Sequence, residues 1–230
     1  MGSFERSKQG RETLLSMQKS AEVIDRGIQQ AITQQLTPIY EPLFSESSYG
    51  YRPKRSAKDA ILKVKEYAER GYTHTVVLDL SKYFDTINHD MLLKILRRNI
   101  KDERVVQIIK RYLKSGVMEN GVVRPTKEGS PQGGNLSPLL ANIYLNEFDK
   151  EFEKRGVPLV RYADDIVLLA KSKRASERIL KTSTKFLEKN LKLKVNQEKS
   201  RTVSVFSLRN FKFLGFALGR NRNGIYIRVH

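Results

Sequence analysis

The chain has 230 residues, and its 43 Lys and Arg against 25 Asp and Glu give a formal net charge of +18 at pH 7. This excess favours a polyanionic partner and strongly salt-dependent binding. Cysteine is absent, which excludes disulfides and thiolate metal sites, and no apolar run reaches the length of a membrane span or a secretion signal.

The predicted elements alternate between helices and mostly antiparallel strands, which is typical of an α+β fold. Apolar residues at helical spacing predict helices over residues 23–39, 57–70, 89–113 (divided near 101–102), 136–152 and 175–187. Apolar and β-branched runs predict strands over 75–78, 159–160, 166–170, 193–195, 200–206, 211–219 and 224–228, with a hairpin over 117–126. The length suits one large domain or two subdomains.

Two adjacent aspartates, Asp164 and Asp165, fall at the turn predicted between two short apolar strands. Adjacent carboxylates repel, and apolar surroundings raise the cost of their charge, so a cation would offset both penalties. Carboxylate oxygens without a nearby His or Cys favour Mg²⁺ or Mn²⁺ over zinc or copper. The alternative is an ordinary hairpin turn, in which Asp is common.

Asp79 ends the run of residues 75–78. Because Asp is disfavoured inside strands, it either caps a helix that begins within residues 81–84 or faces a positive group. Together with Asp164 and Asp165 it would place three carboxylates around one point. That set can hold two divalent ions roughly 3.5–4 Å apart, which bridge phosphate oxygens in an in-line displacement.

Six blocks in this order resemble the reverse transcriptases of group II intron maturases: residues 47–53 (SSYGYRP), 78–90 (LDLSKYFDTINHD), 129–145 (GSPQGGNLSPLLANIYL), 161–165 (RYADD), 193–200 (LKVNQEKS) and 213–216 (FLGF). Related bacterial reverse transcriptases, including CRISPR-associated ones, share these blocks. The resemblance implies a right-hand polymerase fold, with an antiparallel palm sheet backed by helices and with helical fingers. Residues 1–73 and 91–134 would form the fingers, and 74–90 and 135–230 the palm; no thumb is expected before His230.

The resemblance also implies the parts of an active site. Asp79, Asp164 and Asp165 would hold two Mg²⁺ or Mn²⁺ ions, with Asp165 contributing less directly. Tyr83 or Phe84 would pack beneath the incoming sugar and exclude a 2′-hydroxyl. We favour Tyr83 for this role and Phe84 for the core.

Further contacts follow from the matching blocks. Gln132 would approach the nucleotide, and Arg52 would face the nucleotide or the template, although a plain surface arginine is the alternative. Arg26, which the family pattern would place at the triphosphate, lies upstream of these blocks, where residues 18–24 (QKSAEVI) depart from the family in having no proline. The primer would be gripped by a hairpin formed by Phe213, Leu214 and Gly215. Without the other blocks, that hairpin would pass for a core strand.

Two functions from different classes remain open at this point. The first is an RNA-directed DNA polymerase, with an RNA template, intron RNA, a DNA or RNA primer and dNTPs as partners. The second is an RNA-binding module that assists intron folding and splicing with weak or absent polymerisation. We expect no membrane partner, leave a homodimer open, and expect a bacterial cytoplasmic protein that associates with the nucleoid during retrohoming.

Overall fold

The computed structural model describes residues 24–114, 117–119, 122–124, 128–130 and 134–229. A helix covers residues 24–40 of this part, followed by the 3₁₀ turn η1 (Glu41–Leu43) and a loop that leads to α2 (Ala57–Glu69). Ser56 caps α2 with a capping box, in which Asp59 N–H donates to Ser56 Oγ at 3.2 Å and Ser56 N–H donates to the Asp59 carboxylate at 2.9 Å.

A four-stranded antiparallel sheet forms the centre of the molecule, in the order β4-β5-β1-β6. Its members are β1 (His74–Leu78), β4 (Leu159–Tyr162), β5 (Asp165–Ala170) and β6 (Arg201–Ser204). The prediction of a strand over 193–195 is wrong, because this segment forms only an isolated bridge, Leu80 to Val195. Two backbone bonds on either side of that bridge, Ser81 N–H to Lys194 O and Asn196 N–H to Asp79 O, attach the segment just beyond the end of β1.

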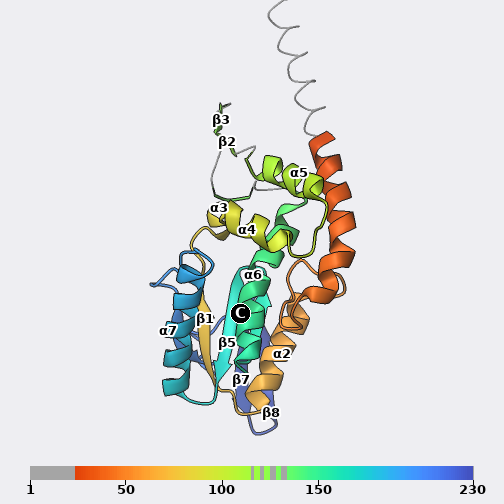
Figure 1. The fold of residues 1–230 in the computed structure, drawn as a ribbon. Coiled ribbons are helices and arrows are strands. Elements are labelled where there is room, and N and C mark those ends of the chain that lie inside the picture. Colours follow the sequence, from red (N-terminus) through yellow and green to blue (C-terminus); the bar gives the residue numbers. More distant parts are fainter. Residues whose placement is uncertain (1–23, 115–116, 120–121, 125–127, 131–133, 230) are drawn as a thin grey trace, which may run out of the picture.

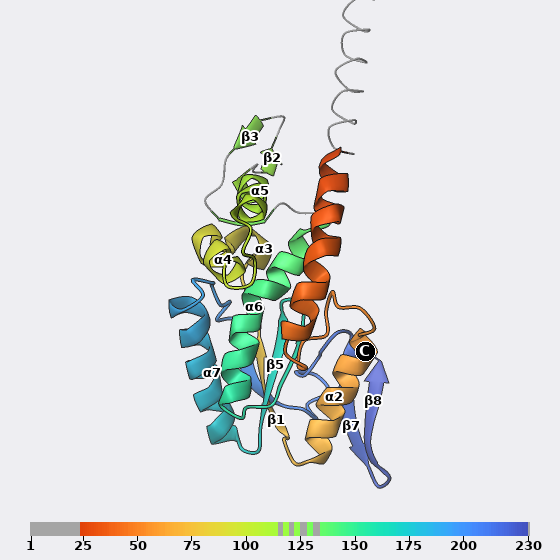
Figure 2. The ribbon, with the colours of Figure 1, turned by 45° about the vertical axis from the view of Figure 1, so that its right-hand side comes forward.

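Both faces of the sheet are buried, and successive residues of β5 point to opposite faces. Ile166 and Leu168 join a core built largely by α4 (His89–Leu96), α5 (Glu103–Lys114), α6 (Ser137–Lys154) and α7 (Lys173–Lys189). Val167 and Leu169 join a second core with α2 and β7 (Phe216–Asn221), which pairs with β8 (Gly224–Val229). Figures 1 and 2 show α6 and α7 beside the sheet and α2 with the β7–β8 hairpin at a separate side.

A cluster of helices lies beyond one end of the sheet (Figure 1). It contains α3 (Tyr83–Thr86), α4, α5 and the helix over residues 24–40, and α6 extends from it down to the sheet. The strands β2 (Val117–Glu119) and β3 (Val122–Arg124) form the hairpin predicted over 117–126. No helix in the described ranges combines the length and the apolarity that crossing a bilayer requires. The division into fingers and palm stays a prediction.

Candidate active site

The Asp164-Asp165 pair lies on the turn that the sequence predicted between two strands. Tyr162 and Asp165 form the last pair of β4 and β5, so Ala163 and Asp164 are the two central residues of the hairpin. Ala163 has φ +57°. A positive φ at the first central residue alone is typical of a type II′ hairpin turn, and for a residue with a Cβ it costs about 1–2 kcal/mol. The turn is therefore held in a conformation that alanine does not favour.

Asp79 stands directly after β1 and faces this turn across the sheet. The register pairs Leu78 with Ile166, so one further step brings Asp79 opposite Asp165, and opposite residues of neighbouring strands share a face. Ser200 Oγ accepts the Asp79 N–H at 3.0 Å. Asp79 does not cap a helix, because α3 begins after Lys82. That alternative is wrong, and the acid is left beside the other two.

The three acids interact electrostatically. Desolvation by the surrounding chain raises the pKa of Asp165, although much of its surface is exposed, and the negative charges of Asp164 and Asp79 raise it further. Lys199, which the sequence interpretation left without a role, places its Nζ 3.8 Å from Asp79 Oδ2. Lys199 lies in the block of residues 193–200, and this position in a family motif was the sequence feature that could have indicated a role at the site. The site thus concentrates negative charge that one exposed lysine offsets in part.

The donor set suits a hard divalent cation, because carboxylate oxygens that repel one another are what Mg²⁺ or Mn²⁺ would neutralise. Over the described ranges, no group of three acidic, His or Cys side chains is already gathered as a metal site. The acids therefore fit the cation by chemistry and by their shared edge of the sheet. The expectation that Asp165 contributes less directly stays a prediction, although Asp165 is the residue in register with Asp79.

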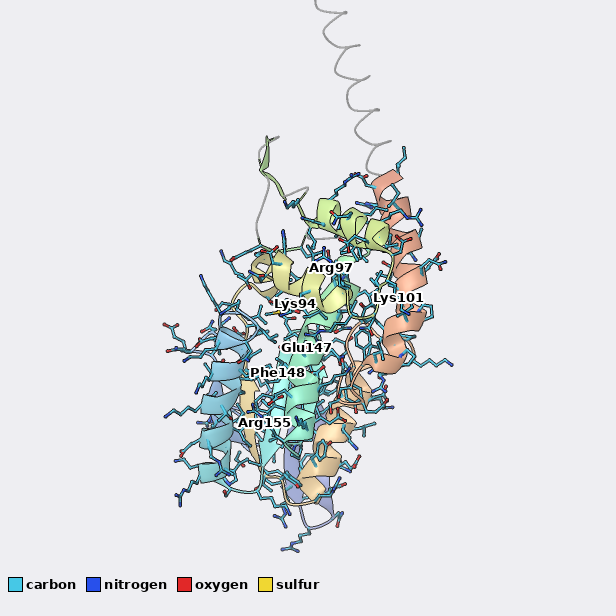
Figure 3. The ribbon with its side chains drawn as sticks, viewed as in Figure 1. Lys94, Arg97, Lys101, Glu147, Phe148 and Arg155 are labelled. Carbon is cyan, nitrogen blue, oxygen red and sulfur yellow. The ribbon has the colours of Figure 1, made fainter. Side chains whose placement is uncertain are left out.

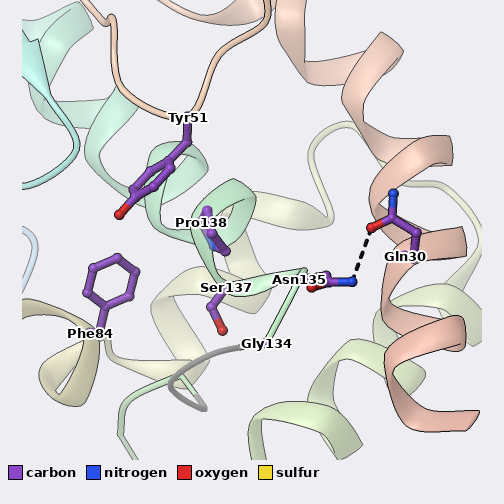
Figure 4. A pocket seen from close by; sticks show the side chains of 7 residues that line it. All are labelled: Gln30, Tyr51, Phe84, Gly134, Asn135, Ser137 and Pro138. Atoms are coloured by element: carbon purple, nitrogen blue, oxygen red, sulfur yellow. Dashed lines mark hydrogen bonds between the residues drawn. The ribbon is translucent and has the colours of Figure 1, made fainter. Parts of the chain in front are cut away.

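The aromatic pair lies in the reverse of the expected arrangement. Tyr83 is buried at 3% exposure, and its hydroxyl donates to Ala141 O at 2.6 Å. Phe84 is half-buried and lines a cavity of about 520 Å³ (Figure 4). The cavity is lined by Gln30, Tyr51, Phe84, Gly134, Asn135, Ser137 and Pro138. The short helix α3 turns the Tyr83 ring toward α6 and leaves the Phe84 ring at the cavity, and the role of either ring toward a sugar stays a prediction.

Arg52 does not lie as expected of a residue that faces the template or the nucleotide. Its side chain is buried, its Nη1 donates to the carbonyls of Ser45 and Ser48, and its Nε and Nη2 donate to Glu41 Oε1. The guanidinium also lies 5.3 Å from the centre of the Phe44 ring. These contacts occupy the arginine inside the protein, where it ties the loop to η1.

The other predicted contact residues have mixed placements. Arg26 is exposed on the helix over residues 24–40, and Gln132 lies outside the described residues. Phe213 is buried in the second core, and it exchanges backbone hydrogen bonds of 2.9 Å in both directions with Phe216. The central residues Leu214 and Gly215 have φ +53° and +80°, which is the pattern of a type I′ turn. The FLGF block is therefore a tight hairpin turn, and its role toward a primer stays a prediction.

Residues 16–218 match the family model described as reverse transcriptase (RNA-dependent DNA polymerase). The chain belongs to the reverse transcriptase family. Protein YkfC of Escherichia coli strain K12 is 36% identical over 86% of this chain and 62% of its own length. The group II intron-encoded protein LtrA of Lactococcus lactis subsp. cremoris is 30% identical over 87% of this chain and 44% of its own length.

The fold is that of a reverse transcriptase, as the resemblance implied. Apo telomerase from Candida tropicalis, truncated from its C-terminal domain, superposes with a TM-score of 0.60 at 14% identity. The match covers 99% of this chain and 49% of the telomerase chain. Of the two curated relatives described above, the chain spans 62% of the length of YkfC and 44% of the length of LtrA.

Proposed function

We propose that the chain is the catalytic core of an RNA-directed DNA polymerase of the group II intron type. The observation that carries this proposal is the position of Asp79, at the end of β1, opposite the Asp164-Asp165 turn in a chain of the reverse transcriptase family. Similarity to the intron-encoded protein LtrA supports the intron lineage. RNA template, primer and dNTPs are the partners that this activity requires.

Asp79, Asp164 and Asp165 would hold two Mg²⁺ or Mn²⁺ ions. When bound, such ions lower the pKa of a primer 3′-hydroxyl and stabilise the charge of the departing pyrophosphate. The protein's own contribution is to bring the three acids to one edge of the sheet, which it does through the pairing of β1 with β5 and the tight turn between β4 and β5. Lys199, beside Asp79, supplies positive charge to the same edge of the site.

Phe84 would select the sugar. Its ring lines the cavity opposite Tyr51 and near Pro138 (Figure 4), and α3 holds it five residues beyond Asp79. A rigid aromatic ring under the sugar leaves no room for a 2′-hydroxyl, so rejection of ribonucleotides would be steric. The Tyr83 ring would pack against the Phe84 ring and hold it in place, because the two ring centroids lie 5.4 Å apart.

The excess of positive charge would bind the phosphate backbone of the template and primer. Charged side chains project from many elements of the fold (Figure 3). Some are already paired: Arg97 binds Glu103 at 2.7 Å and Arg98 binds Glu147 at 2.7 Å. Lys212 is exposed beside the turn at Phe213, whose ring shares the second core with Val167. Asp79 and Asp165 lie on the sheet face that this second core covers. Lys212 is therefore a better candidate for phosphate contact than the paired arginines.

The deciding experiment combines primer extension on an RNA template with filter binding of the same RNA. Asp164→Ala should abolish Mg²⁺- or Mn²⁺-dependent extension and leave RNA affinity unchanged or slightly higher, because it removes negative charge from a polyanion-binding surface. Asp90→Ala, which removes an exposed acid on α4, is the control and should extend normally. Undiminished DNA synthesis by Asp164→Ala would contradict the assignment of Asp164 as a catalytic, cation-binding residue. RNA binding by a parent chain that extends no primer would favour the RNA-binding alternative.

A further inference from the structure

Arg161 is a fully buried arginine only three residues before Asp164. Its side chain on β4 has 0% exposure, as does that of its partner Asp149 on α6. Arg161 Nη2 lies 2.6 Å from Asp149 Oδ2, and Nε lies 2.9 Å from both carboxylate oxygens. Two charges taken out of water in this way need excellent geometry and further hydrogen bonds to be tolerated.

The remaining donors of Arg161 are all engaged, and one of them reaches the turn. Nη2 also donates to Ser48 Oγ at 2.8 Å, and Nη1 donates to Asn142 Oδ1 at 2.8 Å. The second Nη1 bond, of 2.9 Å, goes to the carbonyl of Ala163. The guanidinium therefore connects α6 directly to the backbone of the turn that carries Asp164, and its five N–H donors are satisfied.

The loop of residues 47–50 packs against β4 and the same turn. Arg161 N–H donates to Ser47 O and Tyr49 N–H donates to Arg161 O, both at 2.8 Å, while Asn142 Nδ2 donates to Gly50 O at 2.7 Å. A Cβ added at Gly50 would stand 2.3 Å from the Ala163 nitrogen. Position 50 therefore requires glycine because two backbones approach closely there. A left-handed conformation is not the reason, since Gly50 does not have a positive φ.

We propose that Arg161, anchored by Asp149 and Asn142, is a positioning residue that keeps Ala163 in its left-handed conformation and thereby holds Asp164 and Asp165 against Asp79. This inference rests on the proposed function, because it takes these acids to be the cation-binding residues. Any cationic side chain of the right length could form the ion pair with Asp149 alone. Only the planar fork of an arginine reaches Asp149, Asn142, Ser48 and the Ala163 carbonyl together, so lysine is a poor substitute.

The test is binding of Mn²⁺ alone, followed by the electron paramagnetic resonance signal of the free ion, on the whole chain without nucleic acid. Partners that orient metal ligands typically contribute roughly 10–100-fold to metal affinity. Gly50→Ala and Arg161→Lys should both weaken Mn²⁺ binding by about tenfold or more on that scale. Adding Ala163→Gly to Arg161→Lys should restore part of the loss, because glycine takes a positive φ without a steric cost.

Arg155→Lys is the matched control, because Arg155 at the end of α6 (Figure 3) forms a partly exposed ion pair with Glu151 of that helix. It should bind Mn²⁺ like the parent chain. Circular dichroism establishes which variants fold, and if Arg161→Lys does not fold, Gly50→Ala decides alone.

The outcomes separate the two proposals. Parent-like Mn²⁺ affinity in folded Gly50→Ala and Arg161→Lys, with binding lost in Asp164→Asn, overturns the positioning role and leaves the proposed function standing. A parent chain whose Mn²⁺ binding does not depend on Asp164 overturns both. Weakened binding in Gly50→Ala and Arg161→Lys, with rescue by Ala163→Gly, supports the positioning role.

Discussion

Tyr83 and Phe84 are adjacent in the chain and their ring centroids lie 5.4 Å apart, yet the Tyr83 ring is buried and the Phe84 ring borders a cavity. The Tyr83 hydroxyl donates to Ala141 O inside the core, and the Phe84 ring lines the cavity. We therefore predict that Phe84→Ala raises ribonucleotide incorporation more than it slows deoxynucleotide addition. Competitive single-nucleotide extension with both kinds of nucleotide measures this ratio.

Tyr83→Phe is the control for the sugar gate. It keeps the buried ring and removes the hydrogen bond to Ala141 O, so it should cost about 0.5–1.5 kcal/mol of unfolding free energy and leave the sugar preference unchanged. If Tyr83→Phe alters the preference and Phe84→Ala does not, the gate assignment is reversed. If neither changes it, the gate lies elsewhere.

Breaking the buried ion pair should be costly. Asp149→Asn leaves the Arg161 charge buried without its counterion, and such losses are typically about 3–5 kcal/mol of unfolding free energy. Glu151→Gln removes a half-exposed acid of α6 that pairs with Arg155 just beyond the helix end, and it should change stability by less than about 1 kcal/mol. Urea denaturation of the two variants measures the difference. Equal losses would contradict the view that burial makes the Asp149 pair costly to break.

The sequence could predict the strands and the turn that carry the acids because those signals are local. Apolar residues 159–160 and 166–170 flank Asp164 and Asp165, and residues 75–78 end at Asp79, so short-range patterns alone locate each acid at a strand end. The pairing of β1 with β5 then brings the acids to one edge. Family resemblance supplied their expected role, which local pattern could not.

The sequence could not predict which ring of α3 faces outward or that Arg161 pairs with Asp149. The first depends on how α3 packs against α6, where Tyr83 finds the Ala141 carbonyl 58 positions away. The second joins a strand to a helix, although a charged residue two positions after Leu159, on the same buried face of an apolar strand, indicates a buried partner. Arg52 shows the same limit, since its partner Glu41 belongs to a different segment.

Lys199 and a metal ion would compete for Asp79. The Lys199 ammonium lies 3.8 Å from Asp79 Oδ2 and the lysine side chain is 68% exposed, so the pair is weak and contributes no more than about 1 kcal/mol. Lys199→Gln should therefore tighten Mn²⁺ binding, by no more than about fivefold on that scale. Titration of Mn²⁺ into both proteins checks this. Weaker binding in Lys199→Gln would show that the lysine orders the site instead of competing for it.

The turn of the FLGF block should be sensitive to its backbone conformation. Gly215 has φ +80° and no atom within 4 Å of an added Cβ, so Gly215→Ala should cost about 1–2 kcal/mol of unfolding free energy through the backbone alone. Gly27 also has open space around it but lies in the helix over residues 24–40, so Gly27→Ala should stabilise by about 0.5–1 kcal/mol. Thermal denaturation gives both signs. A stabilised Gly215→Ala protein would contradict the turn assignment.

Nucleic-acid affinity should fall steeply with salt, because the net charge of +18 directs binding to phosphates. If six or more phosphates are engaged, affinity should drop roughly 10³-fold or more between about 50 and 200 mM salt. Lys212→Gln should reduce the salt slope by about one phosphate, since this exposed lysine lies beside the Phe213 turn on the face of Asp79 and Asp165.

Lys181→Gln removes the same charge from α7, which packs on the opposite face of the sheet, and should leave the slope nearly unchanged. Filter binding of a primer–template duplex across a salt series compares the three proteins. A flat titration would refute binding through phosphates. Equal losses in the two variants would show that net charge, and not the face that bears Asp79, determines affinity.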